Sequence, residues 1–124
     1  MHVLVVDDDE ANRTVMCELI ELLNHSAVGA RDRESALAQM RTDPPRVAFI
    51  DLRLGGDSGL DVARDRRRQE AKENLPRVSM FGLTGDATDE AVTACLAAGV
   101  DDCLFKPIYL EVLEAQLGKL SDAW

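Results

Sequence analysis

Five short, mostly apolar runs alternate with five longer amphipathic segments along this chain of 124 residues. The runs are continuous rather than alternately polar and apolar, which is typical of strands buried on both faces. Parallel strands need a crossover that returns the chain to the same edge of the sheet, and a helix usually provides it. The pattern therefore predicts an α/β fold in which a parallel sheet lies between helices. The expected strands are His2–Val6, Ser26–Ala30, Val47–Asp51, Val78–Thr84 and Cys103–Phe105.

The segments between these runs carry apolar side chains at three- and four-residue spacing, as a helix with one buried face does. In the first of them, Val15, Leu19 and Leu22 recur at this spacing. Polar caps, glycines and prolines mark most of the helix ends. The first expected helix covers about residues 11–23, and the second runs from a cap at Asp32 to Arg41. The third covers residues 60–73, the fourth runs from a cap at Thr88 or Asp89 to Gly99, and the fifth covers residues 110–120.

Length and charge restrict the class of protein further. A chain of 124 residues is the size of one domain, and we expect residues 1–124 to form one, with a core over about 3–120. The net charge of −9 disfavours nucleic acid as a partner and leaves no basic stripe for an anionic membrane. No apolar run reaches the roughly 18 residues that span a bilayer, so we expect a cytoplasmic domain without direct membrane contact.

The three cysteines are Cys17, Cys95 and Cys103. Their number is odd, and no two of them have the spacing of a metal site or a redox motif. We therefore expect three reduced thiols that pack as small apolar side chains.

Chemically active side chains follow four of the five expected strands. Asp7 and Asp8 follow the first strand, Asp51 closes the third, Thr84 closes the fourth and Lys106 follows the fifth. Ligands of open parallel sheets bind at the carboxyl ends of the strands, so these five groups are expected to meet at one edge.

These residue types favour phosphoryl transfer. Three adjacent carboxylates repel one another unless a cation neutralises them, and oxygen ligands with open positions suit Mg²⁺. A lysine can neutralise a phosphoryl oxygen, and a threonine hydroxyl can donate to another. The carboxylate of Asp51 can attack phosphorus and form an aspartyl phosphate.

Four stretches resemble a known family over nearly the whole chain, from Val3 to about Leu120. They are VLVVDDDEANR, FIDLRLGGDSG, GLTGDA and GVDDCLFKP, and they look like the receiver domain of two-component response regulators. The resemblance implies a flavodoxin-like, doubly wound (βα)5 fold with the strand order 2-1-3-4-5. It also implies that the bond between Lys106 and Pro107 is cis.

The resemblance assigns a role to each group at the predicted site. Asp51 matches the phosphoacceptor, and Thr84 and Lys106 match the hydroxyl and the lysine that bind the phosphoryl group. The implied cofactor is Mg²⁺ or Mn²⁺. Its implied ligands are Asp7, Asp8, Asp51 and the backbone carbonyl of Arg53.

The chain departs from the family in two places. Receivers often have Met-Pro and Asp-Gly where this chain has Leu54-Gly55 and Ser58-Gly59. They also usually place Tyr or Phe where Cys103 stands, and Phe105 lies two positions farther along the same strand face. Coupling between Thr84 and an aromatic ring is therefore not expected to follow the usual family pattern.

The stretches MFGLTGDA and GVDDCLFKPI look most like receivers of hybrid sensor histidine kinases. Such a receiver takes phosphoryl from the dimerisation and phosphotransfer domain of a kinase and passes it to a histidine phosphotransfer domain. It is not a conventional enzyme: phosphoryl acceptance and slow autodephosphorylation are self-catalysed, and its parent can be a histidine kinase tethered to the inner membrane. Arg53 and Asp86 occupy the positions expected to tune hydrolysis.

The same residues suggest three other functions. A stand-alone regulator and a non-phosphorylated pseudo-receiver share most of these features and stay open. A Mg²⁺-dependent phosphatase is disfavoured, because it would need a carboxylate where this chain has Arg53.

Two groups of residues on the expected helices are candidates for binding a partner. The arginines 64, 66, 67 and 68 are expected either to lie on a solvated helix, paired with Asp65 and Glu70, or to dock a partner. Asn12, Arg13 and Met16 are expected near the site, on the face that would dock a histidine-bearing helix bundle.

Overall fold

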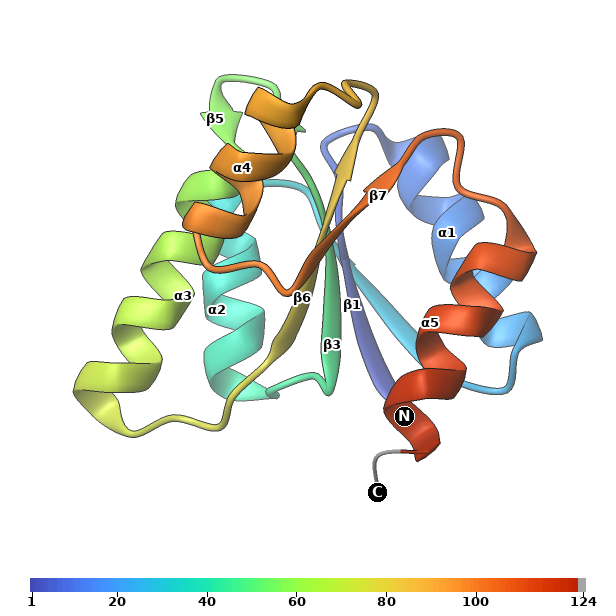
Figure 1. The fold of residues 1–124 in the computed structure, drawn as a ribbon. Coiled ribbons are helices and arrows are strands. Elements are labelled where there is room, and N and C mark those ends of the chain that lie inside the picture. Colours follow the sequence, from blue (N-terminus) through green and yellow to red (C-terminus); the bar gives the residue numbers. More distant parts are fainter. Residues whose placement is uncertain (123–124) are drawn as a thin grey trace.

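The computed structural model describes residues 1–122 and contains a five-stranded parallel sheet of order β2-β1-β3-β6-β7 (Figure 1). Counted along the chain without the short hairpin described below, this is the predicted order 2-1-3-4-5. The doubly wound α/β fold is therefore confirmed. The strands are β1 (His2–Val6), β2 (Ser26–Ala30), β3 (Val47–Asp51), β6 (Ser79–Thr84) and β7 (Asp102–Phe105).

Helices cover both faces of the sheet. Figure 1 shows α2, α3 and α4 on one face and α1 and α5 on the other. Side chains cap the predicted starts of two helices: Asp32 accepts from the Ser35 N–H, and Thr88 accepts from the Ala91 N–H. No helix in residues 1–122 is both long and apolar enough to cross a membrane. The helices are α1 (Glu10–Leu22), α2 (Arg33–Thr42), α3 (Gly59–Glu73), α4 (Asp89–Ala97) and α5 (Leu110–Asp122).

Strand alternation divides the interior into two apolar layers. Leu4 and Val6 of β1 belong to the layer under α2, α3 and α4, whereas Val3 and Val5 belong to the layer under α1 and α5. All four side chains are buried, which explains why the strand is apolar at successive positions.

A small antiparallel hairpin follows β3, where the sequence predicts only a loop. Its strands are β4 (Arg53–Leu54) and β5 (Asp57–Ser58), and they pair Arg53 with Ser58. Gly55 in the turn has a φ of +61°, a left-handed conformation that glycine adopts without a steric penalty. Two-residue strands are too short for periodicity to reveal them.

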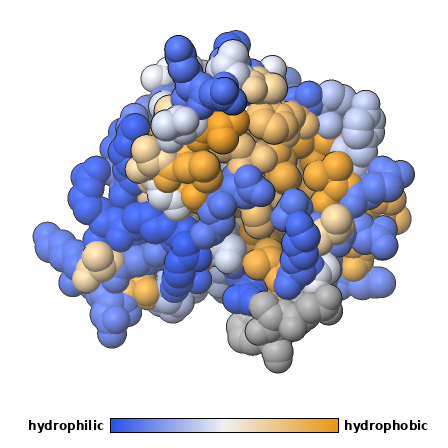
Figure 2. All heavy atoms as spheres, viewed as in Figure 1, coloured by the Kyte–Doolittle hydropathy of each residue, from blue (hydrophilic) through white to orange (hydrophobic). Residues whose placement is uncertain are grey.

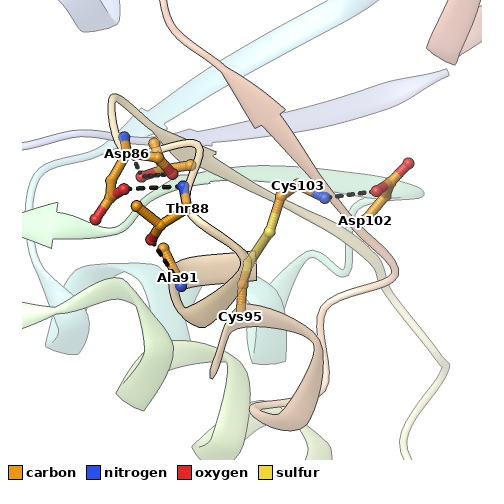
Figure 3. The surroundings of a disulfide bond; sticks show 7 residues. Asp86, Thr88, Ala91, Cys95, Asp102 and Cys103 are labelled. Carbon is orange, nitrogen blue, oxygen red and sulfur yellow. Dashed lines mark hydrogen bonds between the residues drawn. A yellow bond between two sulfur atoms is a disulfide. The ribbon is translucent and has the colours of Figure 1, made fainter. Parts of the chain in front are cut away.

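The structure corrects the expectation of three reduced thiols. Cys95 of α4 and Cys103 of β7 form a disulfide, and their Cα atoms are 6.8 Å apart (Figure 3). Both side chains are buried, and Cys17 is the free cysteine. A spacing of eight residues carries no sign of this pairing, because only the packing of α4 against β7 brings the two side chains together.

The structure also corrects the expectation for half of the arginine cluster on α3. Arg66 is 0% exposed, and its guanidinium donates to Glu70, to the carbonyl of Met40 at 3.3 Å and to that of Pro76 at 2.7 Å. Arg67 donates to Glu70 and to the carbonyls of Val78 and Gly99, at 2.8 and 2.9 Å. The pairing of both arginines with Glu70 agrees with the expectation. Arg66 is buried and so is neither solvated nor available to a partner, whereas the side chain of Arg67 is still 20% exposed.

The other two arginines of the cluster fit the expectation of a charged helix surface. Arg64 pairs with Asp61 at 3.0 Å, and Arg68 pairs with Asp65 at 3.5 Å. The side chain of Arg68 is 74% exposed, so this pair is open to solvent.

Replacement of Arg66 by Ala should lower the free energy of unfolding by about 3 kcal/mol, because the Glu70 carboxylate and two carbonyls would lose a buried donor. The matched change Arg68→Ala should cost about 0.5 kcal/mol or less, since its ion pair is exposed. Urea unfolding of both variants measures the difference. Equal losses would contradict the structural role given to Arg66.

Candidate functional site

Three aspartates meet at the carboxyl edge of the sheet, as the sequence predicts. Asp7 and Asp8 follow β1 and Asp51 ends β3, and these two strands are neighbours in the sheet. One carboxylate oxygen from each aspartate lies within 4.8 Å of the other two. Asp7 and Asp51 are buried and Asp8 is exposed, so the cluster opens to solvent on one side.

Asp51 is held on both sides of its carboxylate. Its Oδ1 accepts the N–H of Arg53 at 3.0 Å, and its Oδ2 accepts from Lys106 Nζ at 2.7 Å. Lys106 follows β7, so this contact joins groups that are 55 residues apart in the chain. The ammonium offsets part of the negative charge of the three carboxylates. The metal bond expected from the Arg53 carbonyl stays a prediction.

Thr84 ends β6 and lines a cavity that Asp51 and Lys106 also line. Its hydroxyl oxygen accepts the N–H of Asp86 at 3.0 Å, and its backbone carbonyl accepts the N–H of Lys106 at 2.8 Å. The cavity is lined by Asp51, Arg53, Thr84, Asp86 and Lys106, among others. The peptide bond from Lys106 to Pro107 is cis, which agrees with the sequence-based expectation.

Gly59, the first residue of α3, makes room for this site. A Cβ atom at Gly59 would lie 2.2 Å from the carbonyl oxygen of Asp51 and 2.9 Å from Cα of Leu52. Backbone atoms cannot move aside as the end of a flexible side chain can, so any larger residue here would displace the turn after β3. Its place four residues after Gly55 in a loop does not reveal this close approach.

The surroundings of Asp7 disfavour the charged form of its carboxyl. Burial raises the pKa of its carboxyl above the ordinary value, and the charges of Asp51 and Asp8 raise it further. The N–H of Asp9, which donates to Asp7 Oδ1 at 2.9 Å, and the Lys106 ammonium act in the opposite direction. A hard divalent cation would offset the repulsion between these carboxylates, and their clustered oxygens are suitable ligands for one.

The strand position where the resemblance leads us to expect Tyr or Phe holds a buried cysteine. Cys103 is buried and joined to Cys95 on α4, whereas the ring of Phe105 is 45% exposed. Figure 3 shows the disulfide between α4 and β7, with Asp86 and Thr88 just before this helix and Ala91 in its first turn. The segment after Thr84 is thus followed by a helix that is covalently tied to the sheet.

Comparison with known proteins gives one family. Residues 3–118 match the model of the response regulator receiver domain, which is nearly the whole chain. A solved two-component response regulator from Clostridium difficile superposes with a TM-score of 0.87 at 22% identity, over 98% of this chain and 96% of that one. This likeness supports the fold observed here.

Several curated proteins similar to this chain are much longer than it is. The chain is 36% identical over 121 residues to the virulence sensor protein BvgS of Bordetella pertussis, covering 96% of this chain and 10% of BvgS. It is 30% identical over 109 residues to hybrid signal transduction histidine kinase L of Dictyostelium discoideum, covering 86% of this chain and 6% of the kinase. The chain therefore corresponds to a small part of each of these relatives.

Replacement of Asp7 by Asn should stabilise the metal-free protein at neutral pH by about 1 kcal/mol, because it removes a buried charge among like charges. The pKa of Asp7 is higher in the folded than in the unfolded state, so stability falls as pH rises from its ordinary to its raised value. The gain should vanish below that window, where Asp7 is protonated. Urea unfolding at several pH values, without divalent cations, measures it.

Asp9→Asn is the matched control for this prediction. Asp9 caps α1 by accepting the Asn12 N–H at 3.1 Å, and Asn caps a helix about as well as Asp. The control keeps the cap and removes a charge outside the cluster, so it should not reproduce the stabilisation expected of Asp7→Asn. An Asp7→Asn profile that runs parallel to the wild-type profile would show that the Asp7 charge is not destabilising.

Proposed function

Because this chain belongs to the response regulator receiver domain family, we propose that Asp51 accepts a phosphoryl group from a phosphohistidine of a histidine kinase. The observation that carries the proposal is the position of the Asp51 carboxylate, between the Lys106 ammonium at 2.7 Å and the paired carboxylates of Asp7 and Asp8. We take residues 3–120 as the functional unit.

The proposed reaction needs a nucleophile and neutralisation of charge. One oxygen of Asp51 forms a bond to phosphorus while the bond from phosphorus to the donor imidazole nitrogen breaks, and the nitrogen leaves with the electron pair. Asp7, Asp8, Asp51 and the carbonyl of Arg53 would hold Mg²⁺ or Mn²⁺. A bound cation supplies positive charge beside the phosphoryl oxygens.

Lys106 and Thr84 are the groups proposed to bind the transferred phosphoryl. The Lys106 ammonium already lies 2.7 Å from Asp51 Oδ2, so it can move to a phosphoryl oxygen without leaving the site. The Thr84 hydroxyl donates only a long bond of 3.4 Å to the carbonyl of Asp86. Redirecting this donor to a phosphoryl oxygen would therefore cost little.

A groove next to the site is a suitable surface for the phosphodonor. It is lined by Val15, Met16 and Leu19 of α1 and by Pro107 and Ile108 after β7, with Asp7 and Lys106 also along it. Val15 is 54% exposed. Figure 2 shows apolar side chains exposed on the face that carries β7. A helix with a histidine could pack here and bring its phosphoryl group to Asp51.

We propose the same groove for onward transfer to a histidine phosphotransfer domain, since donor and recipient would present the same chemical group. The relative named as a hybrid histidine kinase supports a parent protein of that kind, which would place this domain in the cytoplasm. Slow hydrolysis of the phosphoaspartate would take place in the same cavity, beside Arg53 and Asp86.

Asp51→Asn should abolish labelling by a phosphorylated histidine donor in the presence of Mg²⁺, because an amide is not a nucleophile toward phosphorus. The exposed Asp57→Asn serves as the matched control and should be labelled like the wild type. Separation of phosphorylated from free protein on a phosphate-affinity gel measures both. Label on Asp51→Asn would refute the proposal.

Binding of beryllofluoride with Mg²⁺ tests the pseudo-receiver alternative. A phosphorylatable domain should show amide chemical-shift changes near Asp51 and Thr84, since beryllofluoride mimics a phosphoryl group on a carboxylate. A spectrum that does not change would favour an interaction module without phosphorylation.

Val15→Glu should slow phosphoryl transfer from a histidine-bearing protein about tenfold, because it places a charge in the apolar groove. Its reaction with acetyl phosphate should stay at the wild-type rate, since a small donor needs no groove. Leu96→Glu is the control: Leu96 is 46% exposed on α4, which covers the other face of the sheet. Equal slowing by both variants would place the docking surface elsewhere.

A further inference from the structure

Arg13 of α1 does not project to solvent as a docking residue would. Its Nη1 donates to the backbone carbonyl of Asp7 at 2.8 Å, and its side chain is half-buried. The sequence interpretation placed Arg13 on the partner-binding face, so the structure gives this residue a different task. The hydrogen bond links the second turn of α1 back to the residue that ends β1.

The stem of Arg13 lies in a slot made by a glycine on the neighbouring strand. A Cβ atom at Gly29 of β2 would lie 2.8 Å from Cδ of Arg13, 2.9 Å from its Cγ and 3.2 Å from its Nε. The φ of Gly29 is not in the left-handed region, so the backbone itself does not require glycine here. The missing side chain instead makes room for the arginine.

The hydrogen bond from Arg13 completes the attachment of Asp7. The N–H of Asp7 donates to the carbonyl of Ala30 at 3.0 Å, and Oδ1 of Asp7 accepts from Asp9 N–H at 2.9 Å. With Arg13 on the carbonyl, both backbone groups and one carboxylate oxygen have fixed partners. Within residues 1–122, Oδ2 is the polar atom of Asp7 without a hydrogen-bond partner, which leaves it available to a cation.

These hydrogen bonds to Asp7 oppose the repulsion among the three aspartates. Asp7 and Asp51 are buried with one oxygen each inside a 4.8 Å cluster that also includes Asp8, so like charges push the end of β1 away from β3. The turn from Asp7 to Asp9 could relax outward in response. A guanidinium bound to the Asp7 carbonyl and fixed against β2 resists that movement.

We propose that Arg13, seated against Gly29, is a positioning residue that holds Asp7 and Asp8 in the metal-binding arrangement and thereby sets the affinity for Mg²⁺. The inference rests on the proposed function, because it presumes that the aspartates bind a divalent cation. It adds a residue outside the ligand set and a reason for glycine at position 29. Groups that orient metal ligands commonly change metal affinity by about 10- to 100-fold when removed.

Titration with Mg²⁺, followed by NMR amide shifts of residues 7–9 and 51, tests the inference. Arg13→Met keeps most of the stem and loses the donor, so affinity should fall about tenfold. Arg13→Lys should recover part of that loss, since an ammonium can still donate to the Asp7 carbonyl. Arg31→Met is the control, because it removes an exposed arginine that follows β2 at the same edge of the sheet. Solvent and salt screen this charge, so the affinity for Mg²⁺ should change less than about twofold.

Gly29→Ala gives an independent test, because it disturbs Arg13 without altering it. The added methyl group should weaken Mg²⁺ binding as Arg13→Met does. In an Arg13→Ala background, where the stem is absent, Gly29→Ala should have no further effect. Amide hydrogen exchange at Asp9 without metal should quicken in Arg13→Met and Gly29→Ala, at an unchanged urea midpoint.

The outcomes separate this inference from the proposed function. If the wild type binds Mg²⁺ and Arg13→Met and Gly29→Ala bind it equally well, Arg13 is not a positioning residue and the proposed function stands. If Gly29→Ala weakens Mg²⁺ binding by the same factor with Arg13 present and in the Arg13→Ala background, its effect does not pass through Arg13. The packing of Arg13 against Gly29 is then refuted as the cause. If the wild type binds no Mg²⁺, the proposed function and the inference both fail.

Discussion

Repulsion among the three clustered carboxylates is the interaction on which the rest of this structure depends. The adjacency of β1 and β3 in a parallel sheet brings Asp7, Asp8 and Asp51 to one edge, where one carboxylate oxygen of each lies within 4.8 Å of the others. Burial of two of them makes the repulsion stronger than it would be in water. Among the described residues, Lys106 is the one cation that forms an ion pair with these carboxylates, 2.7 Å from Asp51.

Several features outside the cluster can be understood as means of keeping it in place. Gly59 allows the turn after β3 to lie against the Asp51 carbonyl, and the N–H of Arg53 fixes one Asp51 oxygen. On the other side, Ala30 and Arg13 bind the two backbone groups of Asp7. The site is thus built on strand ends whose backbones are tied, which is how a charged constellation can be held ready for a ligand.

Elements away from the site provide a rigid support. Arg66 and Arg67 use the carboxylate of Glu70 and surrounding carbonyls to join α3 to the ends of its neighbours. The disulfide from Cys95 to Cys103 joins α4 to β7 on the same face of the sheet. A covalent bond therefore ties the helix that follows Thr84 to the edge strand of the sheet.

The sequence by itself determined the order of strands and helices, and it located the five groups at the carboxyl edge. Both follow from local regularities, since apolar period and strand-end position depend only on nearby residues. The tertiary structure alone decided that Arg66 is buried, that Cys95 meets Cys103, and that Arg13 packs against Gly29 and donates to the Asp7 carbonyl. Each of these contacts joins different elements. Their packing, and not spacing along the chain, fixes which side chains become neighbours.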